Sequence, residues 1–355
     1  MTEELLFAST TPGLEPALEQ EMRALGWSGV HELGGVSFRG SYQEANLRLR
    51  TAGRVLVRLG EFRARGPRDL LNALRQVPIG RVWDGASPLS IRGVGALARE
   101  CERAASQVWK AKSASSSSPR TEISIRLHAG TCTVSADSSG ELLYLRGYRQ
   151  EVGRAPLRET LAAGMLVLAH FDGGEALWDP MCGSGTIAIE GGLIAMRKAP
   201  GANRRFAFEQ WPSHDGKEWN QRLRAARGEE LAQAPWPMMA TDLNAGALGT
   251  ARRNARRAGV PLTLERLDAT SAKSRAESGL IVSNLPYGKR VGKGDELSTL
   301  FRAFGAALRG PLARWRYALL VADDSPHELL GLAPEKTFAL ENGGIRCRLM
   351  VGSPE

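Results

Sequence analysis

The second half of the chain alternates between short apolar runs and longer amphipathic runs, and this order restricts the fold more than any other feature. A strand, a turn and a helix are predicted in "ALWDPMCGSGTIAIEGGLIAM" and again in "MMATDLNAGALGTARRNARRAG". The pattern continues with strands in "LTLERLDAT" and "SGLIVSNLPYG", a helix in "ELSTLFRAFGAALRG", a strand in "RYALLVAD" and a terminal hairpin in "FALENGGIRCRLMVG". Such alternation is typical of an α/β fold, an open parallel sheet with helices on both faces.

The turns after these strands fall at the carboxyl ends of the sheet, where open α/β sheets bind their ligands. The first turn contains Gly183-x-Gly185-x-x-Ala188, which fits the dinucleotide-binding fingerprint in form. Glycines let a ligand approach the backbone, and the helix that follows offers free N–H groups. The glycine pattern alone leaves a nicotinamide-dependent oxidoreductase open.

Acidic residues at three successive strand ends favour a different cofactor. Asp179 precedes the glycine turn, where its carboxylate would repel a pyrophosphate and attract a cation. S-adenosylmethionine carries an ammonium and a sulfonium and no phosphate. Asp242 can accept hydrogen bonds from both ribose hydroxyls, and Asp268 can accept one from the adenine amino group. Each acid alone is more often a helix cap or a solvated turn residue. Together with the glycine turn they predict an S-adenosylmethionine site.

The spacing of the acids predicts an insertion. Asp242 lies 63 residues after Asp179 (242 − 179), whereas the simple fold has an acid about 20 residues beyond the glycines. Residues 199–237 are therefore expected to be an insertion that is partly helical. Its Trp211 and Trp219 are expected to pack in a small core of its own, with stacking on bases as the alternative. Cys182, within the glycine turn, is interpreted as a small packing residue and not as a nucleophile.

The first half predicts a small α+β unit followed by a basic one. Residues 1–60 alternate as strand, helix, strand, helix and strand. Within residues 61–152 the pattern predicts a helix, a strand and a basic helix. Strands are then predicted in "TEISIRLHAGTCTVSAD" and "ELLYLRGY", joined by a hairpin turn at "DSSGE". Residues 61–155 have 15 basic and 9 acidic side chains, a net charge of +6 within a total of +9. A basic module beside a larger domain suggests nucleic acid as the partner.

Several classes of protein are excluded by composition and motif. The four cysteines lack CxxC spacing, which argues against a zinc site or a disulfide framework, and no metal is expected. The N-terminus has no basic region before an apolar one, and the longest apolar run is short of the roughly 20 residues that span a membrane. We therefore expect a reduced, cytoplasmic protein without a membrane partner. The sequence does not indicate an oligomeric state.

The motif "DPMCGSG" followed by "NLPYG" resembles the class I S-adenosylmethionine-dependent methyltransferases that modify exocyclic amino groups. The segments "TTPGLEPALEQEMRALG", "ANLRLRTAGRVLVRLGEF", "DSSGELLYLRGYR" and "APLRETLAAGML" resemble the THUMP-domain RNA guanine-N2 methyltransferases. The resemblance covers nearly the whole chain and is closest to the large-subunit ribosomal RNA enzymes, with tRNA enzymes as relatives.

The resemblance implies a domain order and an activity. A Rossmann-like class I methyltransferase domain at residues 153–355 would follow a ferredoxin-like segment at 1–60 and a THUMP RNA-binding domain at 61–152. The enzyme would transfer a methyl group from S-adenosylmethionine to N2 of a guanosine in structured RNA, 23S rRNA above all. Fusions of two enzymes occur in this family, and this chain has one catalytic half, so one activity is expected.

The resemblance also implies the site residues. Asn284 would offer its side-chain carbonyl and Leu285 its backbone carbonyl to the amino group of the target base, while Pro286 fixes the turn and Tyr287 stacks on the base. The family commonly has proline where Leu285 stands, and a backbone acceptor survives that change. The implied cofactor-binding residues are Thr160, Asp179, Pro180, Cys182, Gly183, Ser184, Gly185, Asp242, Leu243, Asp268, Ala269 and Asn284.

Four other functions stay open at this point. A tRNA guanine-N2 methyltransferase would use the same motifs. A DNA adenine-N6 enzyme and a protein glutamine methyltransferase share the fold and an Asn-Pro-Pro-Tyr type motif, although neither needs the first half in this form. An RNA-binding assembly factor with a vestigial cofactor site is the alternative of another class. Lys289 and Arg290 are candidates for contact with phosphate.

Overall fold

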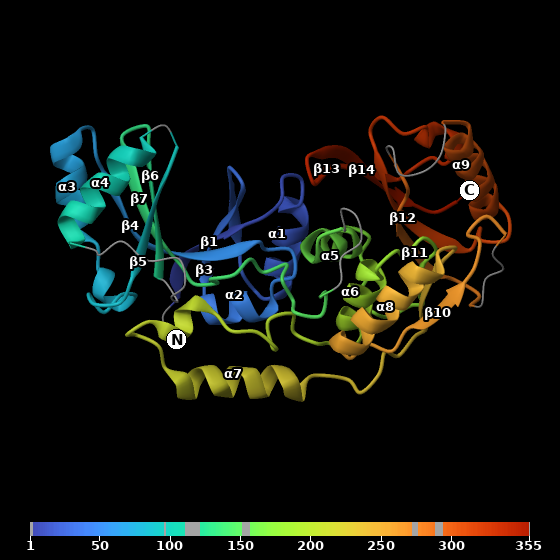
Figure 1. Ribbon diagram of the computed structural model, residues 1–355, viewed down its shortest axis with the longest axis horizontal. Helices are drawn as coiled ribbons and strands as arrows, with labels where there is room; N and C mark the ends of the chain where they lie inside the picture. The colour runs from blue at the N-terminus through green and yellow to red at the C-terminus, as the bar shows by residue number, and fades with distance from the viewer. Residues whose placement is uncertain are drawn as a thin grey trace.

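The computed structural model describes residues 3–95, 97–110, 121–150, 157–271, 276–287 and 294–354. Within these residues the chain forms two seven-stranded sheets. The two halves lie side by side along the long axis of the molecule, the first half at the left of Figure 1 and the second at the right. No helix in the described part is long and apolar enough to cross a membrane.

The first sheet has the strand order β2-β3-β1-β4-β7-β6-β5. Its strands are β1 (Glu4–Ser9), β2 (Gly29–Glu32), β3 (Gly35–Gly40), β4 (Arg54–Arg63), β5 (Leu89–Val94), β6 (Thr121–His128) and β7 (Thr131–Asp137). Its helices are α1 (Glu15–Ala24), α2 (Tyr42–Arg48), α3 (Pro67–Gln76) and α4 (Ala98–Trp109), with a short 3-10 helix η1 (Ile79–Arg81).

Strand β4 joins the two expected N-terminal domains into one sheet, because it pairs with β1 on one side and with β7 on the other. The boundary expected after residue 60 falls inside this strand. The boundary expected after residue 152 lies outside the described residues. The division into a ferredoxin-like segment and a THUMP domain thus stays a prediction, although the α+β character of the first half is confirmed.

The expected hairpin at "DSSGE" is wrong. The chain reverses earlier, at Ala129 and Gly130, which both have positive φ and join β6 to β7 by a two-residue turn. Residues 141–148 form turns and no strand. Two of their apolar side chains are buried for another reason: Leu143 packs in the core of the first half, and Tyr148 packs against Ile189 of the second half.

The second sheet has the order β10-β9-β8-β11-β12-β14-β13. Its strands are β8 (Leu177–Asp179), β9 (Met238–Asp242), β10 (Thr263–Arg266), β11 (Gly279–Asn284), β12 (Trp315–Ala322), β13 (Lys336–Asn342) and β14 (Ile345–Gly352). The helices in the second half of the sequence are α5 (Glu159–Leu168), α6 (Thr186–Ala195), α7 (Gly216–Gly228), α8 (Ala245–Ala258) and α9 (Gly294–Arg309), with short 3-10 helices η2 (Ala207–Gln210) and η4 (His327–Leu330).

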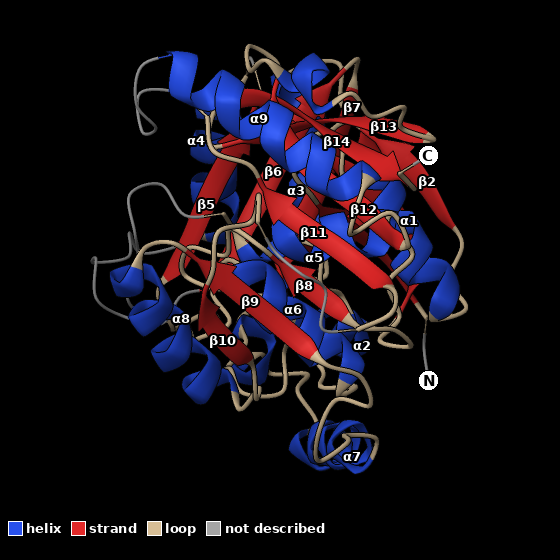
Figure 2. Ribbon diagram, turned by 90° about the vertical axis from the view of Figure 1, so that its right-hand side faces the viewer, coloured by secondary structure: helices blue, strands red, loops and turns tan. Residues whose placement is uncertain are grey.

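Helices cover both faces of the second sheet, as the continuous apolar strands require (Figure 2). Leu280 and Val282 of β11 point to the α5 face, whereas Ile281 between them packs with Phe304 of α9 on the opposite face. Strands β8 to β12 are parallel, and β14 pairs antiparallel with β12. The expected α/β class and the terminal hairpin are confirmed.

The 199–237 insertion does not form a core of its own, so that expectation is wrong. Trp211 and Trp219 instead lie in the apolar core of the first half, together with Tyr42 and Leu47 of α2. The aromatic side chains of the insertion are too few to bury one another from water, and Tyr42 and Leu47 of α2 offer the apolar surface that they need. The insertion thus belongs to the second half by sequence and to the first by packing.

Candidate active site

Three strands of the second sheet end side by side at polar residues. Strand β8 pairs with β9 on one side and with β11 on the other, and the three end at Asp179, Asp242 and Asn284. The order of the strands along the chain reverses at β8, which makes this edge the switch point where open α/β sheets bind ligands. The structure therefore brings together residues that the sequence separates by more than 100 positions.

The glycine turn between β8 and α6 needs both of its glycines. Gly183 and Gly185 have φ values of 52° and 82°, in the left-handed region that favours glycine. A Cβ on Gly185 would lie 3.0 Å from the Cβ of Ala251 in α8, so this glycine permits close helix packing. A Cβ on Gly183 would meet no described atom within 4 Å. Gly183 therefore presents bare backbone on a side that is left open to a ligand.

Asp242 already holds this turn by hydrogen bonds. Its Oδ2 accepts a 2.9 Å bond from the backbone N–H of Gly183, and its Oδ1 accepts a 2.8 Å bond from the N–H of Asn244. Leu243, the next residue, is 58% exposed, which is unusual for leucine and leaves an apolar face beside the carboxylate. A carboxylate next to an exposed apolar side chain suits a ribose with its attached base.

Asp268 and Ala269 follow the edge strand β10. The Oδ1 of Asp268 accepts 2.8 Å bonds from both the N–H and the hydroxyl of Thr270, which closes the turn and fixes the carboxylate. Ala269 is buried in the apolar cluster on the α9 face. Asp268 is thus positioned by its own turn.

Asp179 is 1% exposed, and burial raises the pKa of its carboxyl to about 7. Two hydrogen bonds oppose this shift, since Ser283 Oγ donates to Asp179 Oδ1 at 2.8 Å and the N–H of Met181 donates to the same oxygen at 3.3 Å. Among the described residues no cation lies beside this carboxyl, and a cationic ligand would stabilise such a group.

Cys182 packs with Ala188, Ala240 and Leu248, and burial raises the pKa of its thiol. A thiol of this kind stays protonated at neutral pH, so it is inert as a nucleophile. The other residues named for the cofactor are Thr160, buried in α5, Pro180, whose carbonyl accepts from Thr241 Oγ1 at 3.3 Å, and Ser184, whose carbonyl accepts from Asn254 Nδ2 at 3.2 Å.

Asn284 carries an unpaired acceptor. Its Oδ1 is buried and accepts no hydrogen bond from any group in the described part of the chain. Leaving a buried acceptor unpaired costs on the order of 1–3 kcal/mol, so the free protein holds this oxygen at a cost that a donor on a ligand would remove. The N–H of Leu285 donates to Leu320 at 3.0 Å, which fixes the turn that follows β11.

Tyr287 is buried in the free protein. It is 7% exposed, lies in the apolar cluster on the α5 face, and its hydroxyl accepts a hydrogen bond from Asn342 Nδ2 of β13. Stacking of Tyr287 on a base therefore stays a prediction that requires its ring to become accessible. Pro286 is half-buried beside it. Lys289 and Arg290 lie outside the described residues.

Sequence reasoning missed two residues that hold the site. Ser283, whose hydroxyl holds Asp179, is a polar residue inside an otherwise apolar strand, and that contrast is a signal that could have found it. Thr241 accepts a 3.1 Å bond from Trp178 Nε1 and donates to Pro180, so it ties β9 to β8 below the glycine turn. Nothing in the local sequence indicates the contacts of Thr241 with Trp178 and Pro180.

These residues fit S-adenosylmethionine. Asp179 would hold its cationic amino-acid part, Asp242 its ribose and Asp268 its adenine, while the bare backbone at Gly183 allows close approach. When bound, the cofactor supplies an electrophilic methyl carbon. The described residues contain no group of three or more potential ligands that could hold a metal ion.

The sheet order, the glycine turn and the acids at the strand ends define a class I S-adenosylmethionine-dependent methyltransferase. Residues 146–350 match the model of the RMKL-like methyltransferase domain, and residues 5–56 match that of the RlmL ferredoxin-like domain. The chain belongs to the RMKL-like methyltransferase family, which confirms the resemblance seen in the sequence.

Two named relatives are similar to this chain over 97% of its length. The Ribosomal RNA large subunit methyltransferase K/L of Syntrophotalea carbinolica is 35% identical over 97% of this chain and 53% of its own length, so this chain spans about half of such relatives. A Synechocystis protein named "Putative RNA methyltransferase slr0064" is 29% identical over 97% of this chain and 95% of its own length.

A solved structure supports the cofactor. SMU.472, in complex with SAH, the form of the cofactor that has lost its methyl group, is 27% identical and has a TM-score of 0.84 over 100% of this chain and 99% of its own. SAH is thus bound by a protein that shares this fold over nearly its whole length.

Proposed function

We propose that this protein transfers a methyl group from S-adenosylmethionine to N2 of a guanosine in 23S rRNA. The observation that carries the proposal is the buried Oδ1 of Asn284 at the end of β11, which has no hydrogen-bond partner among the described residues and lies next to the strand that ends at Asp179. An acceptor held in this way suits a substrate group that brings an N–H donor, and an exocyclic amine is such a group.

The chemistry of an aromatic amine explains the need for that acceptor. The nitrogen lone pair is delocalised into the ring, so the amine is a poor nucleophile. Acceptors aimed at its N–H groups favour the pyramidal form and stabilise the positive charge that develops on nitrogen. Asn284 Oδ1 would be one acceptor and the carbonyl of Leu285 the second. A strong general base is not needed, because the product ammonium is acidic.

Two observations support RNA as the substrate. The relatives from Syntrophotalea carbinolica and Synechocystis are both named as RNA methyltransferases, and the likeness extends through the first half of this chain. Residues 61–155 have an excess of six basic over acidic side chains, as expected of a segment that contacts phosphate. We propose that this segment is a THUMP domain that anchors structured RNA by shape and backbone contacts.

The test is transfer of a labelled methyl group from S-adenosylmethionine to total RNA and, in parallel, to DNA and protein from cells that lack the gene, followed by digestion to nucleosides or amino acids. The proposal predicts N2-methylguanosine in the large-subunit rRNA fraction. Label in tRNA would assign a tRNA substrate instead of rRNA. N6-methyladenosine in DNA, or methylglutamine in protein, would assign a different methyl acceptor. If the protein binds SAH but transfers no methyl group, an RNA-binding assembly factor would be favoured.

A further inference from the structure

The 199–237 insertion shares an aromatic core with the first half of the molecule. Phe208 is fully buried, stacks on Phe206 with ring centroids 5.3 Å apart, and meets the ring of Trp219 at 5.1 Å. The fourth ring belongs to Tyr42 of α2, 5.2 Å from Phe208. Trp211 lies 5.3 Å from the same Tyr42 ring, so four rings from the insertion and one from the first half form one cluster.

Backbone contacts fix the insertion against the same surface. The N–H of Gly201 donates to Leu47 at 2.9 Å, and a Cβ at Gly201 would lie 2.5 Å from the carbonyl oxygen of Asn46. Only glycine allows this approach without displacement of one chain. The N–H of Phe208 donates to the carbonyl of Ser138 at 3.2 Å.

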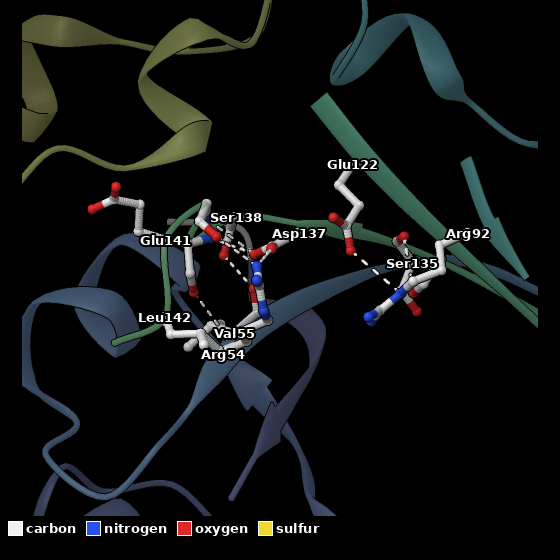
Figure 3. A network of polar contacts seen from close by, with 12 residues as sticks. Arg54, Val55, Arg92, Glu122, Ser135, Asp137, Ser138, Glu141 and Leu142 are labelled. Atoms are coloured by element: carbon white, nitrogen blue, oxygen red, sulfur yellow. Dashed lines mark hydrogen bonds and ion pairs between the residues drawn. The ribbon is translucent and has the colours of Figure 1, made fainter. Parts of the chain in front are cut away.

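The turn that receives the insertion is itself held by a polar network (Figure 3). Arg54 pairs with Asp137, and Ser138 Oγ donates to the carbonyl of Val55 at 2.6 Å, so β4 and the turn after β7 move together. Arg204 of the insertion then donates to the carbonyls of Glu141 and Leu142, at 2.7 and 2.9 Å. The contact surface on the first half is therefore rigid.

Helix α7 adds ion pairs along the lower edge of the molecule in Figure 1, beneath α2. Arg48 forms a bidentate pair with Glu229, with both N···O distances 2.8 Å, and Arg222 pairs with Glu44 at 3.2 Å. The side chains of Arg222 and Glu44 are largely buried, and the bidentate geometry of Arg48 with Glu229 fixes the orientation of α7 against α2.

Both ends of the insertion connect to elements of the methyl-transfer site. It follows α6, which begins at the glycine turn with Gly185, and it leads into β9, which ends at Asp242. We propose that the 199–237 insertion fixes the RNA-binding half relative to Asn284 and thereby determines which guanosine is methylated. This inference rests on the proposed function.

The physical reason is that methyl transfer requires the acceptor nitrogen to meet the methyl carbon in line, and an error of about 1 Å can cost on the order of 100-fold in rate. If RNA is anchored on the first half, its target nitrogen meets the methyl carbon only when the distance between the two halves is fixed. Residues of the insertion that touch the first half are thus positioning residues, which contact neither cofactor nor target base.

Two pairs of variants of the full chain test this. Trp219→Ala removes a ring from the shared cluster, and its matched control is Trp236→Ala, an insertion tryptophan that is 51% exposed. Gly201→Ala wedges the insertion away from Asn46, and its matched control is Gly228→Ala, where a Cβ meets no described atom within 4 Å. Each variant is measured for SAH affinity, for kcat/KM on rRNA and for the position of the methylated guanosine.

We expect Trp219→Ala and Gly201→Ala to bind SAH within about twofold of wild type, to lose roughly tenfold to 100-fold in kcat/KM on rRNA, and to methylate additional guanosines. If Trp219→Ala does not fold, Gly201→Ala decides. Unchanged kcat/KM and an unchanged position of methylation, equal to those of the controls, would overturn the inference while leaving the proposed function intact. Failure of the wild type to methylate RNA would overturn both.

Discussion

Ser283 of β11 donates a hydrogen bond of 2.8 Å to Asp179 of β8, so a hydroxyl next to Asn284 holds the carboxyl that would receive the cofactor's cation. The bond joins the strand that would activate the target amine to the strand that would bind the methyl donor. Burial raises the pKa of Asp179 to about 7, and the bond from Ser283 works against that rise. Cofactor affinity should therefore depend on pH within the physiological range.

The first prediction concerns that pH dependence. The Asp179 carboxyl of the free protein is protonated below about pH 7, and only its carboxylate attracts a cation. SAH affinity should therefore fall as the pH drops below about 7, by up to about tenfold per pH unit, and level off above it. Calorimetric titration across this range measures the effect. Asp179→Asn should bind weakly with no such slope, and a slope that it retains would assign the titration to another group.

The second prediction concerns Ser283 itself. Ser283→Ala removes a hydrogen bond that favours the carboxylate, so the pKa of Asp179 should rise further. The midpoint of the SAH affinity profile should move to higher pH by up to about one unit, since a hydrogen bond to a charged group contributes about 1.5 kcal/mol or more. Ser213→Ala, at an exposed position, is the control. Identical midpoints for the two variants would mean that the bond does not affect the titration.

The third prediction separates the two glycines of the turn. Alanine at either position adds the strain of a positive φ, about 1–2 kcal/mol. Gly185→Ala also presses on Ala251, so it should lower the thermal midpoint more than Gly183→Ala does. Gly183→Ala should instead lose SAH affinity by about tenfold or more, because its methyl group would occupy the open side. The reverse ranking in thermal unfolding and calorimetry would contradict the assigned roles.

The fourth prediction concerns unfolding. Phe208 completes the core of the first half although it lies in the second half of the sequence. Phe208→Ala should cost about 3–5 kcal/mol of unfolding free energy, and denaturant unfolding should stay a single transition, because neither half buries its core alone. Fluorescence and circular dichroism measure this together. Two separate transitions in the wild type would show that the halves are independent.

Much of the second half could be predicted from sequence because its signals are local. Asp179, Asp242 and Asn284 end their strands where the alternation of apolar runs and turns indicated. The predicted hairpin after β7 is wrong because the side chains of Leu143 and Tyr148 pack in two different cores and not in a strand. Tyr148 donates to Glu190 of α6 at 3.0 Å, a contact that no local pattern reveals.

Long-range contacts also explain the other error. The aromatic residues of the insertion correctly predict an apolar core. The surface that completes this core belongs to α2, more than 150 residues earlier in the chain. The unpaired oxygen of Asn284 is likewise a property of the folded structure, since sequence can propose an acceptor but not its burial. The division of the first half into two domains stays a prediction, because one sheet runs through both.

The most direct test of the central claim is the rate of methyl transfer in a single turnover, with S-adenosylmethionine and rRNA both saturating, for the wild type and for Asn284→Ala. Saturation removes any effect on binding, so the rate reports the transfer step alone. We predict N2-methylguanosine as the wild-type product and a rate lower by about 100-fold to 1,000-fold for Asn284→Ala. An undiminished rate, or a different methylated nucleoside, would contradict the assignment of Asn284 as the acceptor for a guanine amino group.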